Sequence, residues 1–164
     1  MSKLIILRGN SGSGKSTVAK ALQQKFGPNT LLISQDAVRR ELLMVRDGAE
    51  NPALPLLLEL LRYGRQHCAV TILEGILNAV WYRPLFEAAQ AEFSTEIFAY
   101  YYDLPFEETL LRHQTKPNRN DFGEQELRSW WNEHDLIGFL PERLLTPSQS
   151  VEEVVQLIWT AVNQ

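Results

Sequence analysis

Residues 9–16 read Gly9-Asn10-Ser11-Gly12-Ser13-Gly14-Lys15-Ser16. They match G-x-x-x-x-G-K-[ST], the P-loop pattern that cradles phosphate groups. The apolar run Leu4–Leu7 precedes the loop and is typical of a strand buried on both faces. Lys15–Phe26 follows it, with apolar residues at helical spacing. Strand, glycine loop and helix together predict a unit that binds the phosphates of a nucleotide.

The residue types in this loop each suit a phosphate site. Gly9 and Gly14 permit backbone angles that other residues avoid, so successive N–H groups can turn toward one anion. The following helix directs the positive end of its dipole at the same point. Lys15 can reach the β- and γ-phosphates, and the Ser16 hydroxyl can ligate Mg²⁺. We therefore expect the nucleotide to be bound by Gly9, Asn10, Ser11, Gly12, Ser13, Gly14, Lys15, Ser16 and Thr17.

Length and composition are those of an ordinary globular domain. The chain has 164 residues, of which 45% are hydrophobic and 22% charged, so we expect one domain over residues 1–164. The single cysteine, Cys68, rules out an internal disulfide framework. A net charge of −4 argues against nucleic acid as a partner. The chain begins directly with a strand-like segment and has no apolar run of membrane-spanning length, which predicts a cytoplasmic protein.

Apolar runs and helical stretches alternate along the chain. The expected strands are Lys3–Leu7, Leu31–Ser34, Val70–Glu74, Thr95–Asp103 and Arg143–Leu145. The expected helices are Lys15–Phe26, Ala37–Val45, Ala53–Gln66, Trp81–Ala91, Phe106–His113, Glu124–His134 and Val151–Val162. This alternation predicts an α/β fold, a three-layer α/β/α sandwich around a five-stranded parallel sheet.

A carboxylate follows the second expected strand. Ligands of open parallel sheets bind beyond the carboxyl ends of the strands, so Asp36 shares a rim with the loop. It could take a proton from an acceptor hydroxyl, or hold a water of the Mg²⁺ shell. Arg39, on the same helical face, could orient an anionic or carbonyl group of the acceptor. The alternative is that Asp36 only caps the helix and Arg39 is solvated.

A second carboxylate follows the third expected strand. Glu74 stands where a P-loop protein places an acidic residue associated with Mg²⁺. Its side chain could instead hydrogen-bond the acceptor, and Asn78 is a further polar contact for it. The alternative is an edge carboxylate without a function.

The polar segment Gln114–Gly123 has no hydrophobic period and lies between two expected helices. The cations Arg112, Lys116, Arg119 and Arg128 lie in it or beside it. Arginines on a closing segment stabilise the charge of a moving phosphoryl group, and closure excludes water. We therefore expect a lid around residues 112–128, with Arg112 and Arg119 as its catalytic arginines. The alternative is a solvated run of charges.

Two smaller features complete the expected site. Trp130 and Trp131, followed by His134 and Asp135, could line an acceptor pocket, although at least one tryptophan is expected in the core. The sequence Asp135-Leu136-Ile137-Gly138 matches the D-x-x-G of GTPases. It lies far from the loop in sequence, and the chain has no N-K-x-D to read guanine, so we reject a GTPase.

Together these motifs resemble small P-loop kinases that phosphorylate hydroxyl groups. Ser34–Arg39 resembles the kinase domain of polynucleotide 5′-kinases, in which the Asp is the general base and the Arg contacts the acceptor's phosphate. Ile72–Gly75 resembles the zeta-toxin-type kinases, in which the Glu contacts the acceptor. Asp103–Arg112 is similar to the approach to the lid in both groups, and chloramphenicol phosphotransferase and gluconate kinase share the plan. The resemblance implies a nucleoside-monophosphate-kinase-like fold with strand order 2-3-1-4-5, and ATP and Mg²⁺ as cofactors.

The leading hypothesis is an ATP-dependent kinase that acts on a hydroxyl of a small molecule, such as a nucleoside, sugar or nucleotide-sugar. The expected roles are catalytic for Lys15, Asp36, Arg112 and Arg119, acceptor-binding for Asp36, Arg39, Glu74 and Asn78, and metal-binding for Ser16, Asp36 and Glu74. Two alternatives stay open: a 5′-hydroxyl polynucleotide kinase and a non-catalytic, ATP-dependent switch.

Overall fold

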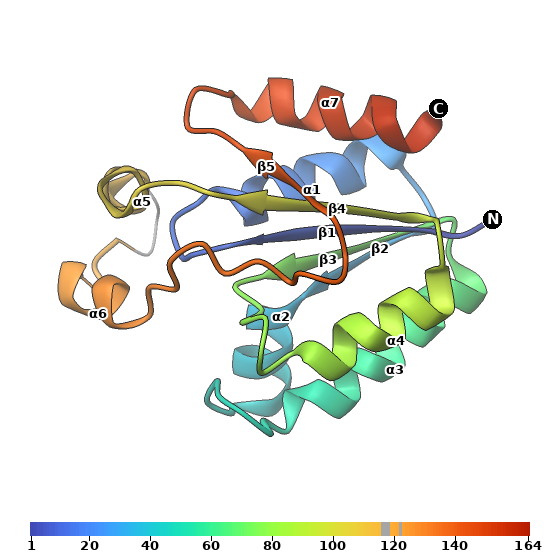
Figure 1. The fold of residues 1–164 in the computed structure, drawn as a ribbon, viewed down its shortest axis with the longest axis horizontal. Helices are drawn as coiled ribbons and strands as arrows, with labels where there is room; N and C mark the ends of the chain where they lie inside the picture. The colour runs from blue at the N-terminus through green and yellow to red at the C-terminus, as the bar shows by residue number, and fades with distance from the viewer. Residues whose placement is uncertain (116–118, 122) are drawn as a thin grey trace.

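The structure, a computed structural model, describes residues 1–115, 119–121 and 123–164. It contains a five-stranded parallel sheet in the order β2-β3-β1-β4-β5, which confirms the predicted topology (Figure 1). The strands are β1 Lys3–Gly9, β2 Thr30–Ser34, β3 Val70–Gly75, β4 Ile97–Tyr102 and β5 Glu142–Leu145.

Helices cover both faces of the sheet. Figure 1 shows α1 and α7 on one face and α3 and α4 on the other, with α5 and α6 beyond the carboxyl ends of the strands. The helices are α1 Lys15–Phe26, α2 Gln35–Ala37, α3 Ala53–His67, α4 Arg83–Phe93, α5 Phe106–Gln114, α6 Glu124–Ser129 and α7 Val151–Asn163, and a π-helix, η1, spans Val38–Leu43. In the described part of the chain, none of the helices has the length and apolar character needed to cross a membrane.

The central strand β1 divides the core into two apolar clusters. Leu4 and Ile6 pack with the residues of α3 and α4, whereas Ile5 and Leu7 pack with those of α1 and α7. All four side chains are fully buried, as the unbroken apolar run predicted. Burial of β1 on both faces fixes the position of the glycine loop that follows it, at the carboxyl edge of the sheet.

Two expected helices differ most from the prediction, whereas the other elements agree to within two residues at each end. The stretch Glu124–His134 is helical only to Ser129, because the backbone N–H and C=O of Asn132 bond the side chain of Asn10 instead of helical partners. The stretch Ala37–Val45 divides into the end of α2 and the π-helix, which stops before Met44. Met44 has a left-handed backbone with φ 56°, which ends the helix there.

Candidate active site

The loop between β1 and α1 has the form of a phosphate cradle. Gly14 adopts φ 100°, in the left-handed region that favours glycine. Lys15 is buried, and its Nζ donates to the carbonyl oxygen of Asn10 at 3.1 Å. Ser13 Oγ is buried in the loop without a hydrogen-bond partner among the described residues. Inward-turned backbone and an unsatisfied hydroxyl suit a phosphate group.

Gly12 serves packing as well as the loop. Its φ is 84°, and a Cβ built on it would lie 2.5 Å from the backbone oxygen of Thr109 in α5. Only glycine therefore lets α5 approach the loop this closely. The sequence pattern leaves position 12 free, so it held no signal for this contact.

Arg112 reaches the loop from α5, and its predicted catalytic role stays a prediction. Its Nη1 donates to the Ser13 carbonyl oxygen at 2.6 Å, and its Nη2 donates to that of Pro147 at 3.4 Å. The guanidinium is oriented by Glu108, whose Oε1 lies 3.1 Å from Arg112 Nε. Arg112 therefore connects the loop to the segment between β5 and α7.

The other cations of the expected lid have different positions. Arg119 lies in an exposed turn, so its predicted role stays a prediction. Lys116 lies outside the described residues. Arg128 forms an ion pair with Glu124 at 3.2 Å, and its guanidinium carbon lies 4.1 Å from the centre of the Phe106 ring.

The two acidic strand ends lie on the rim of the loop. Ser16 Oγ donates to Glu74 Oε2 at 3.2 Å, and Glu74 is only 3% exposed. β2 pairs with β3 so that Ser34 stands opposite Glu74, which places Asp36 just beyond the same edge. Within the described residues no three His, Cys, Asp or Glu side chains form a metal cage. A hydroxyl beside one carboxylate nevertheless fits Mg²⁺, which needs few protein ligands when phosphates supply the rest.

Asp36 is held by two arginines rather than by the helix end. Its Oδ1 lies 2.8 Å from Arg39 Nη2 and 3.1 Å from Arg40 Nε. The helix is capped by Ser34, whose Oγ accepts from Ala37 N at 3.3 Å. Arg39 is largely buried and also donates to the Val45 carbonyl oxygen. The capping role considered for Asp36 is therefore wrong.

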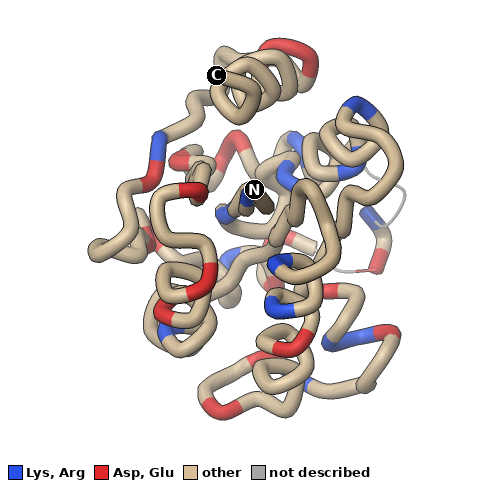
Figure 2. The backbone as a smooth tube through the Cα atoms, turned by 90° about the vertical axis from the view of Figure 1, so that its right-hand side faces the viewer, with Lys and Arg blue, Asp and Glu red and all other residues tan. Residues whose placement is uncertain are grey.

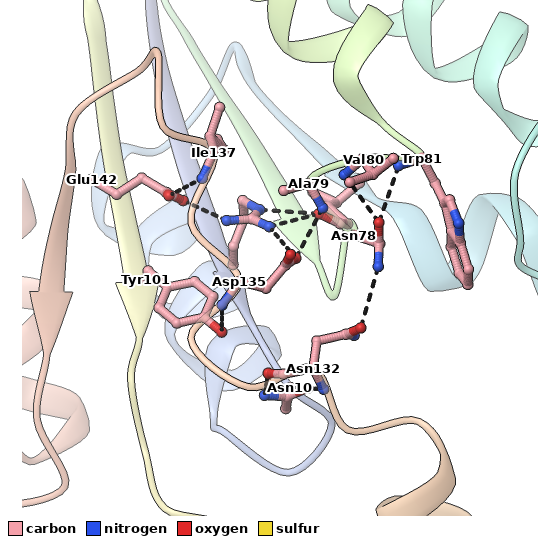
Figure 3. A network of polar contacts seen from close by, with 12 residues as sticks. Asn10, Asn78, Ala79, Val80, Trp81, Tyr101, Asn132, Asp135, Ile137 and Glu142 are labelled. Carbon is pink, nitrogen blue, oxygen red and sulfur yellow. Dashed lines mark hydrogen bonds and ion pairs between the residues drawn. The ribbon is translucent and has the colours of Figure 1, made fainter.

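Asn78 belongs to a polar network around the loop (Figure 3). Its Nδ2 donates to Asn132 Oδ1 at 3.2 Å, and its Oδ1 accepts from the backbone N–H groups of Val80 and Trp81. Asn10 exchanges two 2.7 Å hydrogen bonds with the backbone of Asn132. The loop, the residues after α6 and the β3–α4 connection are thus joined by asparagines.

Beneath this network lies a fully buried arginine that we did not predict. Arg8 contacts Asp135 at 2.8 Å and Glu142 at 2.7 Å, and it donates two bonds to the Leu77 carbonyl oxygen. Figure 3 labels the two carboxylates. A lone arginine between an apolar strand and the loop was the signal for it, because a buried charge requires partners.

A second unpredicted group surrounds Tyr82. Its hydroxyl donates to Asp47 Oδ1 at 2.6 Å and accepts from Gln35 and Asn51. Burial, reinforced by the hydrogen bond and charge of Asp47, raises the pKa of Tyr82 well above its usual value. This cluster connects the residues after η1 to the carboxyl end of β2, next to Asp36 in the chain, and to the start of α4.

Sheet order, phosphate loop and acidic strand ends define a P-loop domain with a kinase-like fold. The chain belongs to the AAA domain family, whose model matches residues 4–132. No curated protein matches the sequence.

Solved structures share the fold over nearly the whole chain. A gluconokinase from Sinorhizobium meliloti matches with a TM-score of 0.70 and 16% identity. The match covers 98% of this chain and 91% of the gluconokinase chain. The tunicamycin resistance protein of Deinococcus radiodurans has a TM-score of 0.67 and 21% identity, with coverages of 99% and 96%. The Mycobacterium tuberculosis APS kinase, in complex with AMPPNP and APS, also has a TM-score of 0.67 and 21% identity, with coverages of 99% and 98%.

Proposed function

We propose that this protein is an ATP-dependent kinase that transfers the γ-phosphoryl group to a hydroxyl of a small molecule, of nucleoside, sugar or nucleotide-sugar type. The observation that carries the proposal is the pair of acidic strand ends beside the phosphate loop: Glu74 bonded to Ser16, and Asp36 just beyond the edge. A nucleotide switch needs the loop, but it has no need of a second carboxylate on the acceptor side.

The donor half consists of the loop and Arg112. Backbone N–H groups of residues 9–14 and the Lys15 ammonium bind the phosphates. Arg112, held between the Ser13 and Pro147 carbonyls, covers them from the side of α5. Ser16 and Glu74 would hold Mg²⁺, with Asp36 near its water shell; the ion would neutralise charge on the β- and γ-phosphates. That adenine is the base is supported by the AMPPNP complex of the APS kinase with the same fold.

The acceptor half centres on Asp36. Both arginine contacts engage Oδ1, and no hydrogen bond within the described residues engages Oδ2. Oδ2 takes the proton of the acceptor hydroxyl as its oxygen bonds to the γ-phosphorus, and the bond to the ADP leaving oxygen breaks. The two arginines orient the carboxylate. Asn78 and Arg39 provide further polar contacts for the acceptor.

Arg119 supplies positive charge from the segment between α5 and α6. Charge spreads over the three oxygens of the transferred group, and an arginine that approaches on closure stabilises it. Exclusion of water at the same time suppresses hydrolysis of ATP.

A small acceptor is supported by charge and by the fold. Figure 2, which faces the amino ends of the strands, shows acidic segments on several elements beside the basic ones, and the whole chain has a net charge of −4. Long polyanions favour a continuous basic face. The structures with this fold include a gluconokinase and an APS kinase, both named for small substrates.

The direct test substitutes Asp36→Asn, which keeps the shape and removes the proton acceptor. Transfer of labelled phosphate to an acceptor should fall by about 10²–10⁴-fold, while affinity for a fluorescent ATP analogue stays within about twofold. Lys15→Ala is the control, because it should weaken nucleotide binding itself. Full transfer activity in Asp36→Asn would remove Asp36 as the base.

A further inference from the structure

A cavity of about 720 Å³ opens beside the loop, on the β4 side of the sheet, and its wall does not include Asp36 or Glu74. This volume is in the range of sites for drug-sized ligands. It lies beneath α5, α6 and the residues that follow α6. Its wall consists of Asn10, Tyr101, Asp103, Leu104, Pro105, Phe106, Glu107, Arg128, Trp131, Glu133 and His134.

The cavity adjoins the end of the loop where phosphoryl transfer takes place. Lys15 reaches the β- and γ-phosphates in this motif, and its Nζ contacts the carbonyl oxygen of Asn10 at 3.1 Å. Asn10 therefore marks the γ-phosphate end, and its side chain is also part of the cavity wall. A molecule in the cavity would lie next to the transferred group.

Two aromatic rings form the apolar part of the wall. Phe106 and Trp131 meet edge to face, with ring centres 5.4 Å apart. Arg128 already occupies a position over the Phe106 ring, at 4.1 Å, and its charge is matched by Glu124. Such ring faces attract cations and the apolar faces of cyclic ligands.

The remaining charges on the wall are negative. Glu107 and Glu133 are exposed, and neither takes part in an ion pair among the residues that the structure describes. Asp103 lies 3.1 Å from Nδ1 of His134, which is neutral unless protonated. The wall thus carries three carboxylates against one arginine, which is paired with Glu124, and one histidine. This arrangement repels anionic ligands and attracts ammonium groups.

We propose that the cavity binds the amine-bearing part of the acceptor, while its reacting hydroxyl lies at Asp36, and that the acceptor is a hydroxyl compound bearing protonated amines, with a ring that packs on Trp131. That the bound compound is a phosphoryl acceptor rests on the proposed kinase function. Its binding to the cavity can be measured independently of that function. Glu107 and Glu133 take the ammonium groups, and Trp131 takes the apolar face of the ring. Among the acceptor types of the proposed function, the cavity favours an amine-bearing nucleoside or sugar over an anionic nucleotide-sugar.

The test measures calorimetric binding of kanamycin A, a polyhydroxylated polyamine, to the wild-type protein. Fully N-acetylated kanamycin A, which keeps the hydroxyls and loses the charges, is the ligand control. Kanamycin should bind, bind more weakly as salt rises, and lose affinity about fivefold in Glu133→Gln and in Glu107→Gln, in keeping with partly exposed ion pairs. Glu152→Gln, an exposed glutamate of α7 outside this cavity, should leave the affinity unchanged.

Equal binding of the acetylated compound, or equal affinity in both glutamine variants and in Glu152→Gln, would overturn the proposal. So would the absence of kanamycin binding. A parallel assay follows label from γ-labelled ATP in the wild type. Transfer to a neutral or anionic acceptor without carboxylate-dependent kanamycin binding removes this inference and leaves the kinase function intact. Carboxylate-dependent binding without transfer to any acceptor supports the cationic site and removes the kinase function.

Discussion

Replacement of Arg8 by methionine tests whether the buried ion pairs beneath the loop hold the site together. Arg8 is fully buried, and the Glu142 side chain that it contacts at 2.7 Å is only 2% exposed. Methionine fills much of the same volume but leaves this carboxylate without its cation. Asp135 is 20% exposed and still accepts a hydrogen bond from Ala79 N, so the loss of Arg8 costs less at Asp135 than at Glu142.

The expected loss is that of a broken buried pair. Removal of one partner from such a pair costs about 3–5 kcal/mol of unfolding free energy. The added change Glu142→Gln removes the stranded charge, so the double variant should recover about 1–3 kcal/mol relative to Arg8→Met alone. Arg62→Met is the matched control, because its partner Glu59 is exposed, and it should cost less than about 1 kcal/mol.

Urea denaturation followed by tryptophan fluorescence gives these free energies, with the denaturant slope checked for each variant. A loss below about 1 kcal/mol in Arg8→Met would refute the reasoning. A double variant less stable than Arg8→Met would also refute it, since Glu142 would then contribute without its cation.

Three further predictions concern single side chains. Gly12→Ala should lower the free energy of unfolding by about 1–3 kcal/mol more than Gly27→Ala does. Both glycines have φ 84°, but no atom lies within 4 Å of the Cβ site at Gly27. Equal losses in the two variants would contradict the clash with α5. The pKa of Tyr82 is raised in the folded protein, so above about pH 10 Tyr82 keeps a proton that it loses in the unfolded chain. The free energy of unfolding should therefore fall as the pH rises above about 10. Tyr82 contributes up to about 1.4 kcal/mol per pH unit to this fall. Denaturation at several alkaline pH values should show that the free energy of unfolding falls less steeply with pH in Tyr82→Phe than in the wild type, and as steeply as in the wild type in Tyr63→Phe. Identical slopes in all three proteins would contradict this. Asn10→Ala removes two 2.7 Å bonds of a buried side chain, whereas Asn78→Ala removes three longer bonds of which two are exposed, so Asn10→Ala should destabilise more in the same assay, and the reverse order would count against the asparagine network.

The loop and the sheet could be predicted because their signals are local. A strand buried on both faces needs an unbroken apolar run. The glycine pattern then predicts the residue at which α1 begins. Contact of Ser16 with Glu74 follows from the sheet, since parallel strands end at one edge. For the same reason, the placement of Asp36 on that rim needed only the order of the strands.

Contacts between distant segments could not be predicted in the same way. Helix α6 ends early because Asn132 bonds Asn10, 122 residues away, and no periodicity carries that information. The Tyr82 cluster joins residues from several elements through hydroxyl and amide groups that also occur on ordinary surfaces. Arg8 carried a signal that was not used, a charge at the end of an apolar strand, and its partners are set by contacts in space.

The most direct measurement of the central claim follows the γ-phosphoryl group of labelled ATP. The purified protein is incubated with Mg²⁺, labelled ATP and a panel of cationic, neutral and anionic hydroxyl compounds, beside its Lys15→Ala and Asp36→Asn variants. The account predicts a phosphate monoester of one acceptor class with wild-type protein, and its near absence with either variant. Release of label only as inorganic phosphate with every acceptor, or equal ester formation by Asp36→Asn, would contradict it.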